Sequence, residues 1–413
     1  MRIKKSVTAM FLAVIILSAC SCETPVSSWS ETVEENRSGS SSIVLNDGAS
    51  ISGGIYIATA KDESVVEASG SVRATVSGAV LRKESGEASS ADDSSFKGVN
   101  AAVRVYGGAE VSLKDCTIES SARNATGVFA YGSGTIRISD STVTVSGGGA
   151  GGVQVAGGGA LYGSNLTVTT ASKAAIRSDK GGGMMVIDGG TYTSTGSDGC
   201  PVIYSTADIT VRNATGSSSN SRAVIIEGKN SVTLEGCVLS GNDQSTKSGS
   251  VRANVLLYQS ASGDAAEGTS VFKMNGGRLV SQSGAMFYCT NTSSVIDLSG
   301  VELVLSEDKT LLTVSAGRWG KDGKNGGKCT FNAKNQILEG IISVDSISQL
   351  DLNLAGSTFT GSVVNEGTVS VTIDTGSRWI LTGDSSVTTI SGDVSKIDLN
   401  GFSLYVNGVE FSV

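Results

Sequence analysis

The stretches VSLKDCTIES (111–120), TIRISDSTVTVS (135–146) and ALYGSNLTVTT (160–170) decide the fold of this 413-residue chain. Each contains a run of alternating apolar residues, a turn of small or Asx-type residues, and a second alternating run. The segments 184–195, 209–218 and 231–241 follow the same plan. Their turns recur with a nearly constant spacing of about 24 residues, at Asp115, Asp140, Ser164, Asp188, Asn213 and Gly236. A single longer step leads to the next two turns, Asn275 and Ser299, because polar insertions occupy 241–250 and 262–269. A period this constant indicates a repeat architecture.

A third short run precedes each of these segments, as in AAVRVYGG (101–108), TGVFAYGSG (126–134) and GGVQVAGGG (151–159). One repeat therefore holds three strands, each roughly four to six residues long, separated by Gly, Asn, Asp or Ser turns. Val, Ile and Leu alternate inward and polar residues outward, as expected for strands that stack on those of the next repeat. The chain has only 2 prolines, in keeping with strands that lie inside continuous ladders. We predict an all-β solenoid with about 24 residues per coil and roughly 11–12 coils.

The period and the pattern resemble the right-handed parallel β-helix of the pectin-lyase-like superfamily and of bacterial adhesin passenger domains. The resemblance extends over roughly residues 43–413, divided into coils at 43–310 and C-terminal coils with a cap at 311–413. A cap is required because the last coil would otherwise expose strand edges, and Trp379 and Phe402 are expected in its core. A β-propeller would need a longer, four-stranded repeat. A β-sandwich does not keep such a period.

The N-terminal segment MRIKKSVTAMFLAVIILSAC (1–20) has the order of a secretion signal: a basic start, a short apolar run and small residues. Leu17-Ser18-Ala19-Cys20 resembles a bacterial lipobox. The resemblance implies that residues 1–19 are removed and that Cys20 is acylated, which would place the protein in the cell envelope, at the outer membrane of a two-membrane host. The alternative is a cleaved signal with an incidental cysteine. Residues 20–42, rich in Ser and Glu, are expected to form a flexible tether.

The amino-acid composition excludes several kinds of catalytic site and binding partner. The chain has no histidine, which excludes imidazole metal sites and histidine-based catalysis. The formal charge of −8 would become −11 after removal of the basic signal, a poor match for nucleic acid. The protein is therefore expected to associate with the membrane through its N-terminal lipid. We predict no cofactor and no metal site.

Cysteines and carboxylate pairs both have plain structural interpretations. Of the 7 cysteines, Cys116 and Cys237 occupy matching turns five coils apart, too far for a disulfide, and are expected to be small buried hydrophobes. The pairs Asp62-Glu63, Asp92-Asp93 and Glu307-Asp308 would serve glycoside hydrolysis or elimination only if they faced a cleft. We interpret them as solvated acidic loops, and no catalytic residue is assigned.

Two residue sets are candidates for ligand binding. The first is a basic, glycine-rich loop on an acidic protein, formed by Arg318, Trp319, Lys321, Lys324 and Lys328. The second is a row in which outward residues of neighbouring coils stack, formed by Arg104, Tyr106, Phe129 and Tyr131. Such sets suit an extended glycan, with aromatic rings stacking on sugars and cations contacting anionic groups. The alternatives are an ordinary surface loop and tyrosines that shield a corner.

The sequence favours a non-enzymatic, adhesin-like surface lipoprotein that displays its faces and loops to a glycan or a surface protein. A polysaccharide lyase or glycoside hydrolase on the same scaffold is the alternative, and a carbohydrate-binding module without turnover is the third. A fold of this kind hosts many activities, so it does not choose among them.

Overall fold

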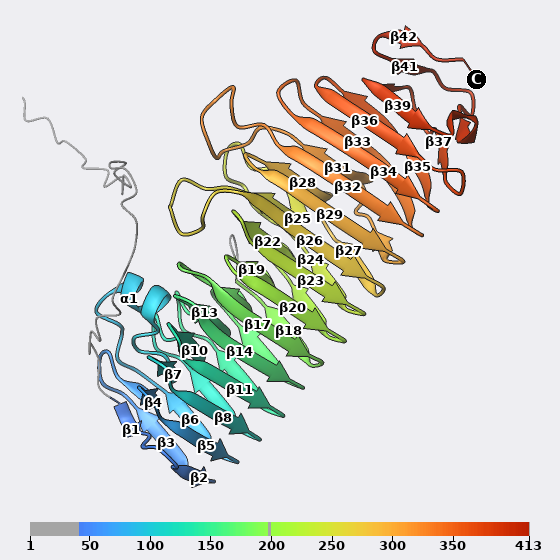
Figure 1. Cartoon of the computed structure of the whole chain (residues 1–413). Helices are drawn as coiled ribbons and strands as arrows, with labels where there is room; N and C mark the ends of the chain where they lie inside the picture. Colours follow the sequence, from blue (N-terminus) through green and yellow to red (C-terminus); the bar gives the residue numbers. More distant parts are fainter. Residues whose placement is uncertain (1–40, 197–199, 413) are drawn as a thin grey trace, which may run out of the picture. The chain divides into compact units, whose positions relative to one another are not determined.

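The computed structural model describes residues 41–196 and 200–412. The expected signal peptide, the lipidation site Cys20 and nearly all of the expected tether lie outside the described residues. The described chain winds into successive coils, and strands at equivalent positions of neighbouring coils pair into three long parallel sheets (Figure 1). The prediction of a parallel β-helix is confirmed.

The first sheet contains 15 strands. In spatial order they are β1 (Ser41–Val44), β4 (Ser64–Ser69), β7 (Val103–Tyr106), β10 (Val128–Tyr131), β13 (Val153–Ala156), β16 (Ile176–Ser178), β19 (Ile203–Ser205), β22 (Val224–Glu227), β25 (Ala253–Tyr258), β28 (Ala285–Thr290), β31 (Thr310–Val314), β33 (Ile337–Val344), β35 (Thr358–Asn365), β37 (Arg378–Ile380) and β40 (Ile397–Asp398).

The second sheet contains 14 strands: β2 (Ser50–Ser52), β5 (Arg73–Ser77), β8 (Glu110–Lys114), β11 (Thr135–Ser139), β14 (Gly159–Ser164), β17 (Gly183–Asp188), β20 (Asp208–Arg212), β23 (Ser231–Glu235), β26 (Thr269–Asn275), β29 (Ser293–Ser299), β32 (Lys328–Lys334), β34 (Gln349–Ala355), β36 (Thr368–Ile373) and β39 (Thr389–Gly392). The third sheet contains 10: β3 (Ile55–Ala58), β6 (Val80–Lys83), β9 (Thr117–Ser120), β12 (Thr142–Val145), β15 (Thr167–Thr170), β18 (Thr191–Ser194), β21 (Thr215–Ser218), β24 (Val238–Gly241), β27 (Arg278–Ser281) and β30 (Glu302–Val304).

The coil period agrees with the sequence over the three-stranded coils. Thr142 pairs with Thr167, and Thr167 pairs with Thr191, so each coil takes up the length of chain that the repeat predicts. The first sheet nevertheless contains more strands than the expected coils would supply. The expectation of 11–12 coils is too low, because about 24 residues per coil divide residues 43–413 into about 15 coils. The third sheet ends at β30, and later coils can be shorter, as where Ile337 pairs with Thr358.

The turn between the second and third sheets contains a residue of positive φ in coil after coil. Asp140 and Asn165 adopt φ values of 50° and 51°, in the left-handed region that Asx residues and glycine tolerate. The Asn165 side chain also donates from Nδ2 to Oδ1 of Asp140 in the previous coil, at 2.9 Å. At Gly189 and Gly236 glycine takes this position instead. Each of these turns thus redirects the chain through a residue of positive φ, and at Gly189 the following Gly190 has a positive φ as well.

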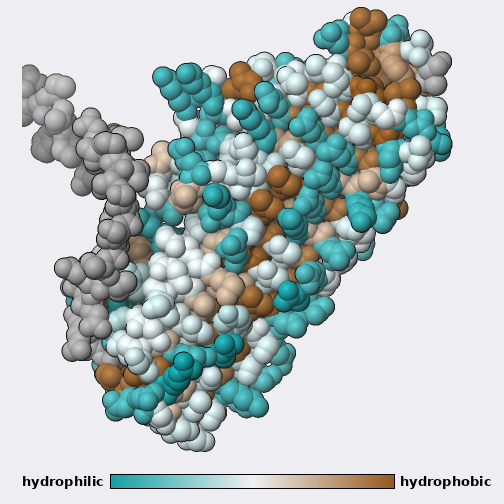
Figure 2. All heavy atoms as spheres, in the orientation of Figure 1, coloured by the Kyte–Doolittle hydropathy of each residue, from teal (hydrophilic) through white to brown (hydrophobic). Residues whose placement is uncertain are grey.

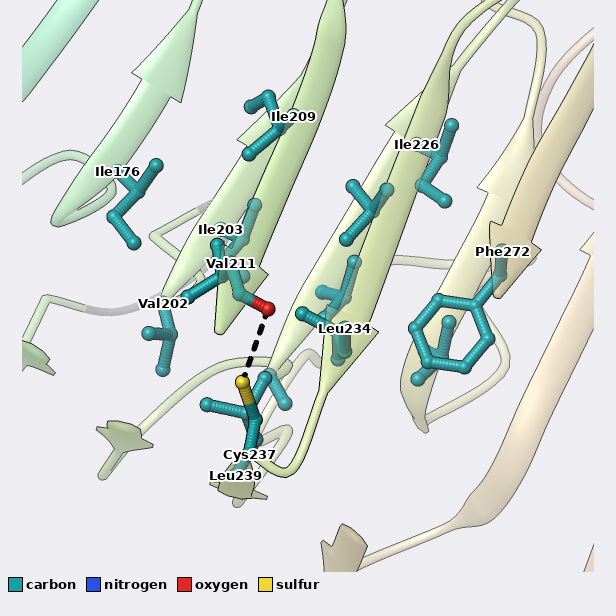
Figure 3. Close-up of a cluster of buried hydrophobic side chains, with 14 of the residues drawn as sticks. Ile176, Val202, Ile203, Ile209, Val211, Ile226, Leu234, Cys237, Leu239 and Phe272 are labelled. Atoms are coloured by element: carbon teal, nitrogen blue, oxygen red, sulfur yellow. Dashed lines mark hydrogen bonds between the residues drawn. The ribbon is translucent and has the colours of Figure 1, made fainter. Parts of the chain in front are cut away.

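The core is a continuous column of apolar side chains enclosed by the three sheets. Figure 3 shows a section of it, in which the Cys237 thiol donates to the carbonyl of Val211 at 3.3 Å. Burial raises the pKa of the Cys237 thiol, which favours the neutral form. All five cysteines of the described chain are buried and none forms a disulfide, as expected of small hydrophobes: Cys116, Cys200, Cys237, Cys289 and Cys329.

The C-terminal end has a small sheet of its own. It is formed by β38 (Ser385–Val387), β41 (Leu404–Val406) and β42 (Val409–Glu410), with a short 3₁₀ helix η1 (Val394–Lys396) beside it. Trp379 is fully buried, stacks on Phe359 and donates from Nε1 to the Gly361 carbonyl at 3.1 Å, as expected of a cap core. The expectation for Phe402 is wrong, because it is 39% exposed. Hydrophobic atoms gather on the surface at this end (Figure 2).

One cation is enclosed within the first coils. Lys83, at an inward position of β6, is fully buried and donates from Nζ to the carbonyl of Ala60 at 2.5 Å. Burial lowers the pKa of Lys83 to about 8, although Glu63 and Asp62 partly oppose the shift. Below that pH the folded protein must hold a buried ammonium group.

We expect replacement of Lys83 by methionine to stabilise the first coils at pH 7, by roughly 1–3 kcal/mol. The folded state loses its lysine proton near pH 8 and the unfolded state near pH 10.5, so the wild type should gain stability as the pH rises through this window. Urea unfolding of both proteins at pH 7 and pH 10 measures the difference. Lys61→Met, at an exposed position beside the same coil, is the control. An unchanged wild-type stability between the two pH values would contradict the prediction.

An insertion between β6 and β7 covers part of the first sheet. It contains helix α1 (Ala91–Lys97), whose first turn is capped when the Asp93 amide donates to Oγ of Ser90. The helix ends at Gly98, which has a φ of 70°. A side chain at that position would collide with Phe129, so the glycine lets the loop lie directly on the sheet. No helix within the described part of the chain has the length and apolar character needed to cross a bilayer.

Candidate functional site

The outward side chains of the first sheet form one line across the coils, which is mainly polar and aromatic up to Tyr204 and then apolar at Ile225 and Leu256. We call this line the outer strip. It follows the register of the sheet, in which Arg104, Phe129, Gln154, Arg177 and Tyr204 occupy equivalent positions on successive strands. Both predicted residue sets lie along it, the stacked row at its N-terminal part and the basic loop at its C-terminal part.

The predicted stacked row exists, but it is covered. Phe129 pairs with Arg104, and Tyr131 with Tyr106, as the repeat predicted. The expectation that these residues form an open surface is wrong for Arg104, Tyr106 and Phe129, which are 3%, 7% and 0% exposed. The insertion carrying α1 lies on them, and the Arg104 guanidinium donates from Nε to the Lys97 carbonyl at 3.0 Å.

The tyrosines of this row differ in exposure. Tyr106 is buried, lies 4.3 Å from the Arg104 guanidinium carbon and donates to Oε1 of Glu67 at 3.0 Å. Burial raises the pKa of the Tyr106 phenol, and the Glu67 carboxylate raises it further. Tyr131 is partly exposed. This part of the strip therefore holds the insertion in place and offers Tyr131 as its accessible edge.

The central part of the strip is a charged network that the sequence analysis did not single out. Arg177 pairs with Asp179 at 2.8 Å, and its guanidinium carbon lies 4.4 Å from the ring centroid of Tyr204. Gln154 donates from Nε2 to Asp179 at 3.3 Å and to the Ser95 carbonyl of α1 at 2.9 Å. The network thus ties the insertion to the middle coils.

The network continues through Glu227, which is 1% exposed. The hydroxyls of Tyr204 and Tyr258 both donate to its Oε2, the second at 2.8 Å. Ser260 and Ser262 donate to Oε1. Four hydroxyl donors therefore solvate a buried carboxylate, which is how a protein retains a charge away from water. Burial raises the pKa of both tyrosines, so they remain neutral donors.

Lys173 stands beside this network. Its ammonium group donates to the Ser95 hydroxyl at 2.6 Å. Burial lowers the pKa of Lys173 to about 8, and the nearby Arg177 lowers it further, while Asp179 and Asp92 act in the opposite direction. A lysine poised near neutral pH is chemically more versatile than an ordinary surface lysine.

The basic loop folds back onto the C-terminal part of the strip. Trp319 is partly buried, with its ring centroid 4.5 Å from that of Tyr258. Arg318 is exposed and its guanidinium carbon lies 5.3 Å from the Trp319 ring. The Asn325 amide donates to the carbonyls of Gly317 and Trp319, which closes the loop. Lys321, Lys324 and Lys328 are all exposed. The structure therefore places an arginine, a tryptophan and a tyrosine side by side, with the two rings tilted by 48°, on a segment that also carries three exposed lysines.

The carboxylate pairs serve local structure rather than a shared cleft. Asp93 pairs with Lys97 within α1 at 3.0 Å. Asp62 accepts the Ser89 amide at 2.6 Å, and Asp308 accepts the Ser306 hydroxyl. Within residues 41–196 and 200–412, no cluster of three or more His, Cys, Asp or Glu side chains is arranged to hold a metal ion.

The fold places the protein in the class of parallel β-helix proteins, here with loops packed on the outer face of the first sheet. Comparison of the chain with known protein families, with curated proteins and with solved structures finds no match to any of them.

Proposed function

We propose that this protein is a lipid-anchored, non-enzymatic β-helix of the cell envelope that presents its outer strip to an extended glycan. The observation that carries the proposal is the contact of Arg318, Trp319 and Tyr258 in a loop that also carries exposed lysines. An aromatic ring next to cations suits a sugar that bears carboxylate or sulfate groups. The formal charge of −8 makes a basic loop unusual on this chain and supports a dedicated contact.

The lysines are the sharpest probe of this contact. Trp319 packs on Tyr258, so its removal would also loosen the loop, whereas Lys321 and Lys324 are exposed. We expect the double change Lys321→Ala and Lys324→Ala to weaken binding of an anionic glycan about tenfold at low salt, and to flatten the salt dependence, because exposed cations act through screened charge. Binding to a glycan array at two salt concentrations measures both effects.

The matched control removes two lysines from the second sheet, by Lys114→Ala and Lys334→Ala, which changes the net charge equally. Equal losses in both double variants would show that only net charge matters. Unchanged binding in the loop variant, with a wild type that binds, would remove the basic loop from the proposal.

A polysaccharide lyase is the second candidate, and Lys173 is the observation that favours it. Elimination from a uronate breaks the C5–H and C4–O bonds and forms a C4=C5 double bond; a lysine with a pKa of about 8 would take the C5 proton in its neutral form and return it to the leaving glycosidic oxygen. Partial burial beneath α1 would exclude bulk water from the reaction.

One assay distinguishes the polysaccharide lyase from the non-enzymatic glycan-binding protein. Acidic polysaccharides that bind are incubated with the protein, and the ultraviolet absorbance of unsaturated uronate is followed from pH 6 to pH 9. Turnover that rises towards pH 8 and is lost in Lys173→Ala would establish the lyase. Binding without new absorbance would favour display.

A further inference from the structure

The outer face of the third sheet carries a regular array of hydroxyl side chains. On four successive coils the two outward positions of the strand are Thr-x-Thr or Thr-x-Ser, and the sheet pairs them in register. We call this set the threonine array. One column is formed by Thr142, Thr167, Thr191 and Thr215, and the other by Thr144, Thr169, Thr193 and Ser217.

The array is open, and it carries no charge. All eight side chains are exposed or partly exposed, while the residues between them, such as Val143 and Val168, are buried. Most of the hydroxyls make no hydrogen bond within residues 41–196 and 200–412, and Thr191 and Thr215 lie 3.2 Å apart. Ion pairs lie beyond its two ends, Arg82 with Glu119 at 2.7 Å and Arg278 with Glu302 at 3.0 Å.

The spacing of the array is fixed by the backbone. Adjacent parallel strands lie about 4.8 Å apart, and alternate residues of one strand about 6.6 Å apart. Threonine is β-branched and stiff at χ1, so its methyl and hydroxyl keep one orientation at little further entropic cost. The sheet of 10 stacked strands holds the coils in register. Hydroxyls and methyls therefore repeat in two dimensions on a stiff support.

Ice has nearly the same two repeats. Water oxygens joined by a hydrogen bond lie about 2.8 Å apart, so tetrahedral geometry places second neighbours about 4.5 Å apart and repeats the structure along the hexagonal axis after about 7.4 Å. Both repeats lie within roughly a tenth of those of the threonine array. Over four coils the mismatch accumulates to less than one hydrogen-bond length.

Other partners fit the array less well. A charged polymer would find no counter-charge among the eight side chains. A sugar ring would find no aromatic side chain on which to stack among them. We propose that the threonine array binds ice, with the hydroxyls joining the ordered water layer and the methyls filling gaps within it. This property does not rest on the outer strip, which belongs to the first sheet.

The test uses the purified mature chain in slowly growing ice. We expect the wild type to enter the ice and to slow recrystallisation, and Thr167→Lys to reduce retention about tenfold by placing a charge in the middle of the array. The same change on the second sheet, Thr210→Lys, is the matched control and should be retained like the wild type. Thr167→Ser keeps the hydroxyl, and it should lose less than the lysine variant does.

Circular dichroism melting checks that all variants are folded. Exclusion of the folded wild type from ice would overturn the proposal, as would equal retention of Thr167→Lys and the wild type. If Thr167→Lys instead abolished binding to crystalline cellulose or self-association, without ice retention by the wild type, the array would have another partner and the proposal would be wrong. Loss of glycan binding in the lysine-loop variant should leave ice retention unchanged, so the two proposals fail separately.

Discussion

Replacing Val128 by aspartate is expected to unfold its coil and the coils on either side. Val128 is fully buried at an inward position of β10, between Val103 and Val153 of the neighbouring strands. An ionised carboxylate there has no cation or donor to meet it, so the cost should be on the order of 4 kcal/mol or more. Because each coil contacts mainly its neighbours, the damage should spread locally rather than through the whole solenoid. Limited proteolysis should cut first between positions 103 and 156.

Two controls separate charge from burial in this experiment. Thr144→Asp introduces the same charge on the outer face of the same coil, and should leave the protease pattern unchanged. Val128→Ala removes volume without adding a charge, and should cost roughly 1–3 kcal/mol. Protection of the Val128→Asp variant equal to that of the wild type would contradict the assignment of this residue to the core.

Replacing Cys20 by serine is expected to release the protein from membranes almost completely. The expectation rests on Leu17-Ser18-Ala19-Cys20 and on the acidic character of the chain, which gives the remainder no electrostatic attraction to anionic lipid. Fractionation of cells that express each form measures the distribution. Metabolic labelling with a fatty acid should mark only the wild type.

The folded part should be the same in both forms, so their melting temperatures provide the control. Equal recovery of wild type and Cys20→Ser in the membrane fraction would refute lipid anchoring. It would leave the β-helix and its outer strip as they are.

The fold was predictable because the repeat is visible in single residues. Alternating valine and isoleucine runs gave the strands, and Asp115 and Asp140 marked the turns that the structure confirms as left-handed. In four repeats the residue used to locate the turn in the sequence precedes the residue with positive φ by one position. Ser164, for example, precedes Asn165. Such an offset arises because both residues are small and polar, and composition alone does not say which one adopts the strained conformation.

The end of the third sheet at β30 was not predictable from the repeat period. The segment that follows Val304 still alternates, and alternation alone does not reveal whether a strand finds a partner in a third sheet. Pairing decides this. Ile337–Val344 is one long strand that pairs with Thr358–Asn365, so a single element runs where earlier coils place two.

The site was predictable in register but not in exposure. The repeat showed that Phe129 points away from the core. Phe129 is nevertheless covered by the insertion between β6 and β7, and the repeat does not predict where that insertion lies. The central network had a signal that could have been followed, because the outward column continues from Gln154 to Arg177 and Tyr204 at the same repeat position. Glu227 and its hydroxyl donors are different, since Ser260 and Ser262 reach it from an insertion whose path the sequence does not specify.

The recurring turn between the second and third sheets has a genetic consequence. Since the coils around Asp115, Asp140 and Asn165 share a turn with one residue of positive φ, a duplicated or deleted coil among them would find compatible neighbours. Loss of residues 128–152, for example, would bring Val153 beside Val103 and Thr167 beside Thr117, with inward and outward positions preserved. Unequal recombination between repeats can therefore lengthen or shorten such a gene in steps of one coil, and so set how far the C-terminal end stands from the first coil, without any new strand having to be invented.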